Sequence, residues 1–239
     1  TAQPSPAAAT ARAGEPARTT SHPSPTDAPP DTPVDPLAPV TPDPTHRPAA
    51  AATRTVPHVL YIGASPDDHA QLRVDRGLRE LLGIAEWGGI VVEPVPAAMA
   101  SDLRRIRATR PDILHLACHG SGESLLFEDI HGEEHAVSAH QIVRTLRLYR
   151  DEVGIRLRGL VLASCDSEAI VEQFRGTADT VVAHTGPLDD LCANAFAGLF
   201  YREVAHGLGL AGAARVAARL TVLDNESCEA LESGLVVLS

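Results

Sequence analysis

Residues 113–120 read Ile-Leu-His-Leu-Ala-Cys-His-Gly, an apolar run that closes on a histidine and a glycine. A second run, Leu-Val-Leu-Ala-Ser at residues 160–164, closes on Cys165. Short apolar runs bounded by small or polar residues are typical of buried strands in a parallel sheet. The carboxyl ends of such strands border the ligand crevice. We therefore expect His119 and Cys165 to meet at one edge of an α/β sheet.

Working outward from these runs, strand and helix patterns alternate along the chain, which predicts a mostly parallel sheet with helices on both faces. A β-hairpin with glycine in its turn is expected between residues 125–129 and 135–137. The other expected strands are 58–63, 90–94, 113–118, 160–164, 180–184 and, at one edge, 235–238. The expected helices are 72–87, one from 101 that ends before Pro111, one capped by Ser138, a short one near 169–171, 189–206 and 209–220.

The N-terminal segment differs in composition from the rest of the chain. Thirteen of the 19 prolines lie within residues 1–55, among alanine, threonine and serine. This segment lacks the large apolar side chains that would offset its ordering entropy, so we expect a disordered Pro/Ala/Thr-rich linker. Residues 56–239 are then one domain. Because the chain begins at Thr1, we expect a missing upstream module on the other side of the linker.

Charge and cysteine usage narrow the classes of function. The net charge of −11 disfavours a nucleic-acid surface. No apolar run approaches the ~20 residues of a membrane span, and no signal peptide is evident. The four cysteines (118, 165, 192 and 228) are widely spaced, which favours free thiols and a cytoplasmic, reducing location over a disulfide framework.

A thiol and an imidazole at neighbouring strand ends predict a cysteine hydrolase and, within that class, a peptidase. Cys165 would attack a peptide carbonyl, and His119 would promote thiolate formation and protonate the departing amine. The backbone N–H groups of Gly120 and Cys165 are the expected oxyanion donors. A helix directly after Cys165, with Ser167 as a possible cap, would lower the pKa of the thiol through its positive end. No third catalytic residue is evident.

Other chemistries have less support. A phosphate-binding Cys-x5-Arg loop beginning at Cys165 is excluded, because position 171, where the arginine would stand, is valine. Neither Gly-x-Ser-x-Gly nor a nucleotide-binding glycine motif is present, and no cofactor is expected. His115, Cys118, His119, His131 and His135 include metal-ligand types. We expect no metal site among them, because His115 and Cys118 face opposite sides of a strand.

Several pieces of the sequence together resemble the CHAT domain, a caspase-like module of the clan of caspases, separases and gingipains. The pieces are residues 61–66, Leu72-Arg73 with the helix to Trp87, residues 110–120, 160–167 and 195–201. The resemblance extends over about residues 56–220. It implies a caspase-like three-layer α/β sandwich with His119 and Cys165 as its dyad.

The same resemblance implies a prokaryotic effector endopeptidase in defence or cell-death signalling, controlled by a recognition module on the same or another polypeptide. Its partner would be a protein or peptide substrate. The alternative is a catalytically silent scaffold or signalling module of the same fold. A weaker third possibility is a thiol hydrolase or transferase acting on a small molecule.

Four acidic residues follow the outer expected strands and are candidates for substrate binding. Asp67 and Asp68 follow the first strand, and Asp189 and Asp190 follow the fifth. Members of the clan hold substrate as an extended strand, and acidic groups here would select arginine or lysine before the cut. The competing interpretation, which we favour for each of the four, is capping of a helix N-terminus.

Overall fold

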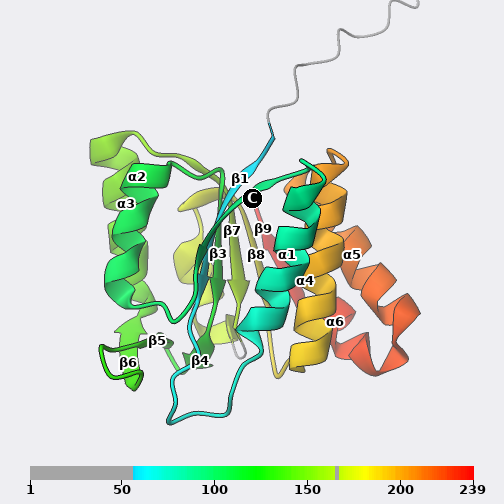
Figure 1. The fold of residues 1–239 in the computed structure, drawn as a ribbon, viewed down its shortest axis with the longest axis horizontal. Coiled ribbons are helices and arrows are strands. Elements are labelled where there is room, and N and C mark those ends of the chain that lie inside the picture. The colour runs from blue at the N-terminus through cyan, green and yellow to red at the C-terminus, as the bar shows by residue number, and fades with distance from the viewer. Residues whose placement is uncertain (1–55, 165–166) are drawn as a thin grey trace, which may run out of the picture. The chain divides into compact units, whose positions relative to one another are not determined.

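The computed structural model describes residues 56–164 and 167–239 (Figure 1). Contacts divide the chain into Thr1–Ala49 and Ala50–Ser239, and only the second unit contains described residues. Two expected features lie outside the described residues: the linker at residues 1–55 and the nucleophile at Cys165. The side chain of Ser167 is likewise not described.

A six-stranded sheet forms the centre of the fold, with strand order β2-β1-β3-β7-β8-β9 (Figure 1). All neighbours pair in parallel except β9, which runs antiparallel to β8 at one edge. This confirms the mostly parallel sheet and all six expected strands. The strands are β1 (His58–Gly63), β2 (Val91–Val95), β3 (Ile113–Ala117), β7 (Leu157–Ala163), β8 (Ala178–His184) and β9 (Leu235–Leu238).

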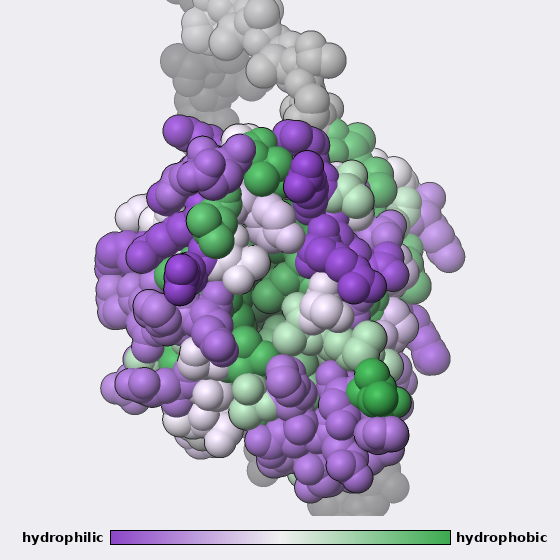
Figure 2. Space-filling model, turned by 90° about the vertical axis from the view of Figure 1, so that its left-hand side faces the viewer, coloured by the Kyte–Doolittle hydropathy of each residue, from purple (hydrophilic) through white to green (hydrophobic). Residues whose placement is uncertain are grey.

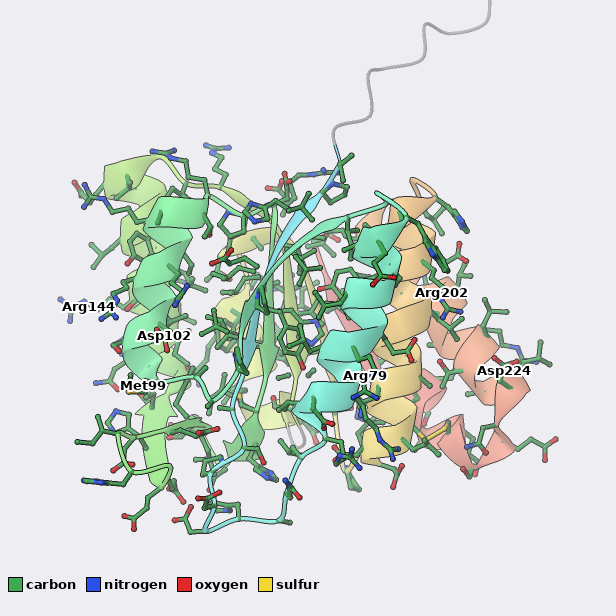
Figure 3. All side chains as sticks on the ribbon, viewed as in Figure 1. Arg79, Met99, Asp102, Arg144, Arg202 and Asp224 are labelled. Atoms are coloured by element: carbon green, nitrogen blue, oxygen red, sulfur yellow. A yellow bond between two sulfur atoms is a disulfide. The ribbon has the colours of Figure 1, made fainter. Side chains whose placement is uncertain are left out.

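Helices cover both faces of this sheet and give the three layers visible in Figure 1. One face packs against α2 (Arg105–Thr109) and α3 (Ala139–Val153), and the surface outside these helices is mostly hydrophilic (Figure 2). The other face packs against α1, α4, α5 and α6, and here Arg202 of α4, labelled in Figure 3, reaches Glu80 of α1 at 3.4 Å. These helices are α1 (Val74–Glu86), α4 (Asp190–Ala205), α5 (Leu210–Asp224) and α6 (Glu229–Gly234).

The central strand β3 is buried on both faces, as its sequence, apolar except for His115, predicts. Leu114 and Leu116 belong to the core under α2 and α3, whereas Ile113 and Ala117 belong to the core under α1, α4 and α5. Successive side chains of a strand alternate between the faces of its sheet, so each helix layer receives every second residue of β3. The end of β3, which lies two residues before His119, is thereby fixed between two cores.

A second, antiparallel sheet follows β3 and has the order β4-β5-β6. Its strands are β4 (His119–Ser121), β5 (Ser124–Glu128) and β6 (Glu134–Ser138). The expected hairpin is confirmed as β5 and β6, and Gly132 in its turn has φ +84°, which favours glycine. Strand β4 was not expected, so His119 begins a strand rather than a turn.

Several helix boundaries test the capping expectations. Ser138 caps α3, because its hydroxyl accepts a hydrogen bond from Gln141 N–H at 3.3 Å. The expectation that Asp67 and Asp68 cap a helix is wrong: α1 begins after Arg73, which makes no side-chain cap bond.

The segment after Cys165 also differs from expectation. It forms two short 3₁₀ helices, η2 (Ser167–Ala169) and η3 (Val171–Phe174), where a helix able to polarise the thiol was expected. Such short turns align too few peptide dipoles to act as a helix end. Two further 3₁₀ helices, η1 (Ala100–Arg104) and η4 (Glu226–Cys228), precede α2 and α6.

The expectation of four free thiols is wrong for two of them. Cys192, in the first turn of α4, forms a disulfide with Cys228 in η4, 36 positions further on (Figure 3). Closing a loop of this length restricts the unfolded chain, and chain-entropy arguments assign it about 3–4 kcal/mol. The pairing weakens the inference of a reducing compartment that rested on the cysteine spacing.

Among residues 56–164 and 167–239, no helix combines the length and apolar character needed to cross a membrane.

Candidate active site

The two strands that carry the expected dyad are neighbours in the sheet. Strands β3 and β7 pair in parallel, and Ala117 lies opposite Ala163. The backbone N–H of Cys118 still reaches the carbonyl of Ala163, at 3.4 Å. Positions 119 and 165 each follow these paired alanines by two residues. The sequence-based prediction that the two strands lie close together is therefore confirmed, although Cys165 itself is outside the described residues.

His119 is half-buried and its ring is held by the backbone. Its Nε2 lies 2.7 Å from the carbonyl oxygen of Ala70, in the loop between β1 and α1. A carbonyl oxygen only accepts hydrogen bonds, so Nε2 donates and Nδ1 is the basic nitrogen of the neutral ring. Sequence reasoning missed this contact with Ala70, because a backbone carbonyl exists at every position and gives no sequence signal.

The four candidate aspartates are distributed over three environments. Asp67 and Asp68 lie beside the β5–β6 hairpin, where Asp67 N–H donates to the carbonyl of Gly132 and the carboxylate of Asp68 accepts from Glu134 N–H. Asp189 caps α4, because its carboxylate accepts from Leu191 N–H at 2.8 Å, so the capping interpretation is confirmed for this residue. Asp190 lines a cavity at the strand ends.

That cavity, of about 40 Å³, lies between the ends of β1, β3 and β7 and the first turns of α1 and α4. Asp190 is half-buried in its wall, and one carboxylate oxygen accepts from Arg73 N–H at 2.9 Å. The guanidinium of Arg73 pairs instead with Asp75 at 3.0 Å. The remaining wall is contributed chiefly by Tyr61, Leu72, Val74, Gly77, His115, Ala117, Ala163, Ala193, Asn194 and Ala197.

A second, mainly apolar cavity of about 20 Å³ continues from the first toward β8. Four residues line both cavities: His115, Ala163, Ala193 and Ala197. A larger hollow of about 570 Å³ lies at the other end of the strands, near the amino ends of β1, β3 and β7. Its lining includes Pro57, Asp112 and Arg158. Ligands of open α/β sheets bind at the carboxyl ends of the strands, so the smaller cavities, which Ala117 and Ala163 help to line, are the candidate substrate pocket.

A buried aromatic cluster supports the floor of these cavities. His115 stacks on Tyr61 with ring centroids 4.9 Å apart, and its Nδ1 lies 3.0 Å from the hydroxyl of Tyr201. Burial lowers the pKa of His115 to about 3 and raises the pKa of both tyrosines above its usual value. All three groups are therefore uncharged near neutral pH, and His115 cannot serve as a cationic substrate ligand.

Cys118 is a second thiol next to His119, but its environment makes it a poor nucleophile. It is 2% exposed and belongs to the core under α2 and α3. Burial raises the pKa of its thiol to about 12, with a small opposing effect from the Leu126 N–H. The thiolate is the reactive form of cysteine, so Cys118 is inert at neutral pH.

The described residues also contain one group with metal-ligand chemistry. Ligand atoms of Asp68, His69 and Glu134 lie within 4.8 Å of one another. Two of these side chains already bond each other, because Nε2 of His69 lies 2.5 Å from a carboxylate oxygen of Glu134. The carboxylate of Asp68 is likewise engaged by Glu134 N–H. We therefore interpret this group as a hydrogen-bonded clamp. His115 and Cys118 lie in different cores, which agrees with the expectation that they cannot share an ion.

Fold and site together define a three-layer α/β domain with a histidine and a cysteine position at adjacent strand ends. A family model described as the CHAT domain matches residues 37–233. The chain therefore belongs to the CHAT domain family, a caspase-like cysteine peptidase family. The match begins upstream of residue 56, where we expected the domain to start.

One curated relative is a Roc-COR-CHAT protease from an unknown prokaryotic organism. It is 30% identical over 154 residues, which cover 60% of this chain and 14% of the relative. Similar solved structures include the Drosophila initiator caspase Dronc, at 10% identity and a TM-score of 0.47 over 69% of this chain and 72% of that chain. Another is Caspase-1 from Spodoptera frugiperda, at 13% identity and a TM-score of 0.49 over 76% of this chain and 85% of that chain.

Proposed function

We propose that this chain is a cysteine endopeptidase in which Cys165 is the nucleophile and His119 its base. The observation that supports this most directly is the register of β3 and β7, which sets Ala117 opposite Ala163 two residues before each position. The bond from His119 Nε2 to Ala70 leaves Nδ1 as the basic atom. A positioned base and a thiol are the two requirements for covalent acyl transfer.

In the proposed reaction, the thiol proton of Cys165 passes to Nδ1 of His119. The sulfur then bonds to the carbonyl carbon of the peptide, and the backbone N–H groups of Gly120 and Cys165 stabilise the oxyanion. As the intermediate collapses, His119 returns the proton to the departing amine and leaves an acyl-enzyme. Water, deprotonated by His119, hydrolyses the thioester and regenerates the thiol.

The wider role is part of the same proposal. The chain would be a prokaryotic effector whose activity is controlled by another module. Support comes from the Roc-COR-CHAT architecture in the name of the relative, of which this chain covers 14%. The Cys192–Cys228 disulfide weakens the basis for the cytoplasmic location that the cysteine spacing predicted.

A peptide-like electrophile separates this proposal from the silent scaffold. The full chain should gain one adduct by intact mass, which peptide mapping places on Cys165, and the same preparation should cleave a peptide library. Cys118 should stay unlabelled in the folded chain because its thiol is buried and protonated. If the chain neither gains an adduct at Cys165 nor cleaves peptides, even when a regulatory module is supplied, the scaffold interpretation is supported.

We further propose that Asp190, alone of the four aspartates, selects a basic residue before the cut. It lines the strand-end cavity, and only one of its two oxygens is used by Arg73 N–H. Replacing Asp190 by asparagine keeps an acceptor for that N–H and removes the charge. We expect kcat/KM for substrates with arginine before the cut to fall about 10-fold or more, as for loss of one partner of a partly buried ion pair.

Asp189→Asn is the matched control for this experiment. Asparagine caps helices about as well as aspartate, so α4 should be unaffected. Cleavage after arginine should stay at the wild-type rate in Asp189→Asn. An unchanged preference in Asp190→Asn, or the same loss in both variants, contradicts the assignment of Asp190.

A further inference from the structure

The imidazole of His119 is anchored by a loop that lies largely on the surface. Its Nε2 bonds the carbonyl of Ala70, and Ala70 is itself exposed. A hydrogen bond can orient a catalytic ring only if its partner is held in place. The position of His119 therefore depends on what holds residues 64–70, the loop that follows β1.

Three hydrogen bonds join the β5–β6 hairpin to this loop. Ser65 N–H donates to a carboxylate oxygen of Glu128 at 2.9 Å, and Asp67 N–H donates to the carbonyl of Gly132 at 2.9 Å. Glu134 N–H donates to a carboxylate oxygen of Asp68 at 3.1 Å. Glu128 and Glu134 are paired across the hairpin, on either side of its turn.

His69 joins the hairpin to the catalytic ring directly. On one side, its Nε2 lies 2.5 Å from a carboxylate oxygen of Glu134. On the other, its ring packs against that of His119, with centroids 5.4 Å apart and planes inclined by 39°. The next residue in the chain is Ala70, whose carbonyl anchors His119. One side chain thus supports both the face of the catalytic ring and its backbone anchor.

The pair contributes little to overall stability. The side chains of His69 and Glu134 are 33% and 34% exposed, and ion pairs in such positions are screened by solvent. Orientation is more sensitive than stability, because displacement of a catalytic group by about 1 Å can slow a reaction by up to about 10²-fold. These two properties predict a loss of activity without a matching loss of stability.

We propose that His69 and Glu134 are positioning residues for His119, and that the β5–β6 hairpin controls the catalytic ring through them. This inference rests on the proposed peptidase function. It assigns to the hairpin a role in regulation: any partner that displaces β6 would move Glu134, then His69 and the Ala70 carbonyl, and thereby the base.

The test is a double-mutant cycle on the full chain. His69→Ala and Glu134→Ala should each lower kcat about 10-fold with little change in KM, because they misplace the base and not the substrate. The double variant should be no worse than either single variant, since both act through one contact. Glu134→Gln, which keeps an acceptor for His69 Nε2, should stay within about 3-fold of wild type.

Two controls separate positioning from general damage. Glu133→Gln makes the same charge change as Glu134→Gln on the neighbouring residue and should leave kcat unchanged. The melting temperature of every variant should stay within about 3 °C of wild type. Additive losses in the double variant, losses confined to KM, or losses that track a lower melting temperature overturn the proposal.

A readout without substrate distinguishes failure of this inference from failure of the peptidase proposal. The rate at which iodoacetamide alkylates Cys165 should fall in Glu134→Ala, and the imidazole ¹H–¹⁵N signals of His119 should shift. If Cys165→Ala still cleaves, the peptidase proposal fails. The positioning proposal alone fails if Cys165→Ala is inactive while Glu134→Ala matches wild type in three measurements. These are the rate of Cys165 alkylation, the rate of peptide cleavage and the imidazole signals of His119.

Discussion

Replacement of Cys165 by alanine is expected to remove peptide cleavage, and His119→Ala is expected to lower kcat/KM by about 10³-fold or more. The first substitution removes the atom that would form the acyl-enzyme. The second removes the proposed base and would leave the thiol without a proton acceptor at Nδ1. The measurement is hydrolysis of a fluorogenic peptide library by each full-length variant, with the circular-dichroism spectrum and melting temperature recorded alongside.

Cys118→Ala is the matched control, because it removes a thiol one residue before His119. Cys118 is 2% exposed and its thiol pKa is raised to about 12, so it should contribute packing and no chemistry. We expect its kcat/KM to stay within a few-fold of wild type, with some loss of stability from the small cavity. Cleavage that survives Cys165→Ala, or disappears in a folded Cys118→Ala, contradicts the assignment of the nucleophile.

The fold could be predicted from sequence because its signals are local. The runs around 113–118 and 160–164 are apolar except for His115 and Ser164, and they form adjacent central strands. Glycine at 132 and serine at 138 marked a turn and a cap that the structure contains. Each of these features depends on residues within a few positions of one another, so the amino-acid pattern is sufficient to indicate it.

The parts that could not be predicted depend on contacts between distant segments. The Ala70 carbonyl meets His119 49 positions away, and His69 meets Glu134 65 positions away. The Cys192–Cys228 disulfide joins segments whose spacing fits no framework pattern. Strand β4 forms because β5 folds back beside it, although residues 119–121 have no strand pattern of their own. No local propensity encodes such contacts.

The aspartates show the same division within the candidate site. Asp189 and Asp190 are adjacent and identical in type, yet one caps α4 and the other lines the cavity. Which one faces the cavity depends on where the helix begins, and helix ends are the least certain feature of a sequence pattern. Asp67 and Asp68 follow β1 as expected, but α1 begins only after Arg73 and leaves them beside the hairpin.

The second large effect is expected in acid, where the buried His115 should make the fold unstable. Its folded-state pKa is about 3 because of burial, whereas an unfolded histidine titrates near 6.5. Between these values the unfolded chain binds a proton that the folded chain excludes. Stability is therefore fully retained above pH ~6.5 and falls as the pH decreases toward about 3, with a contribution on the order of 4 kcal/mol.

Urea unfolding from pH 7 to pH 4 measures this effect by comparison with His115→Asn. The side-chain amide of asparagine can occupy the place of Nδ1 beside the Tyr201 hydroxyl and does not titrate. The variant should be less stable at pH 7, because it is smaller than the ring that stacks on Tyr61. Its unfolding free energy should fall less steeply in acid, so the two curves converge. If the unfolding free energies of wild type and His115→Asn depend on pH in parallel, His115 is protonated in the folded state. That result would contradict the claim that the cluster beneath the cavity is uncharged.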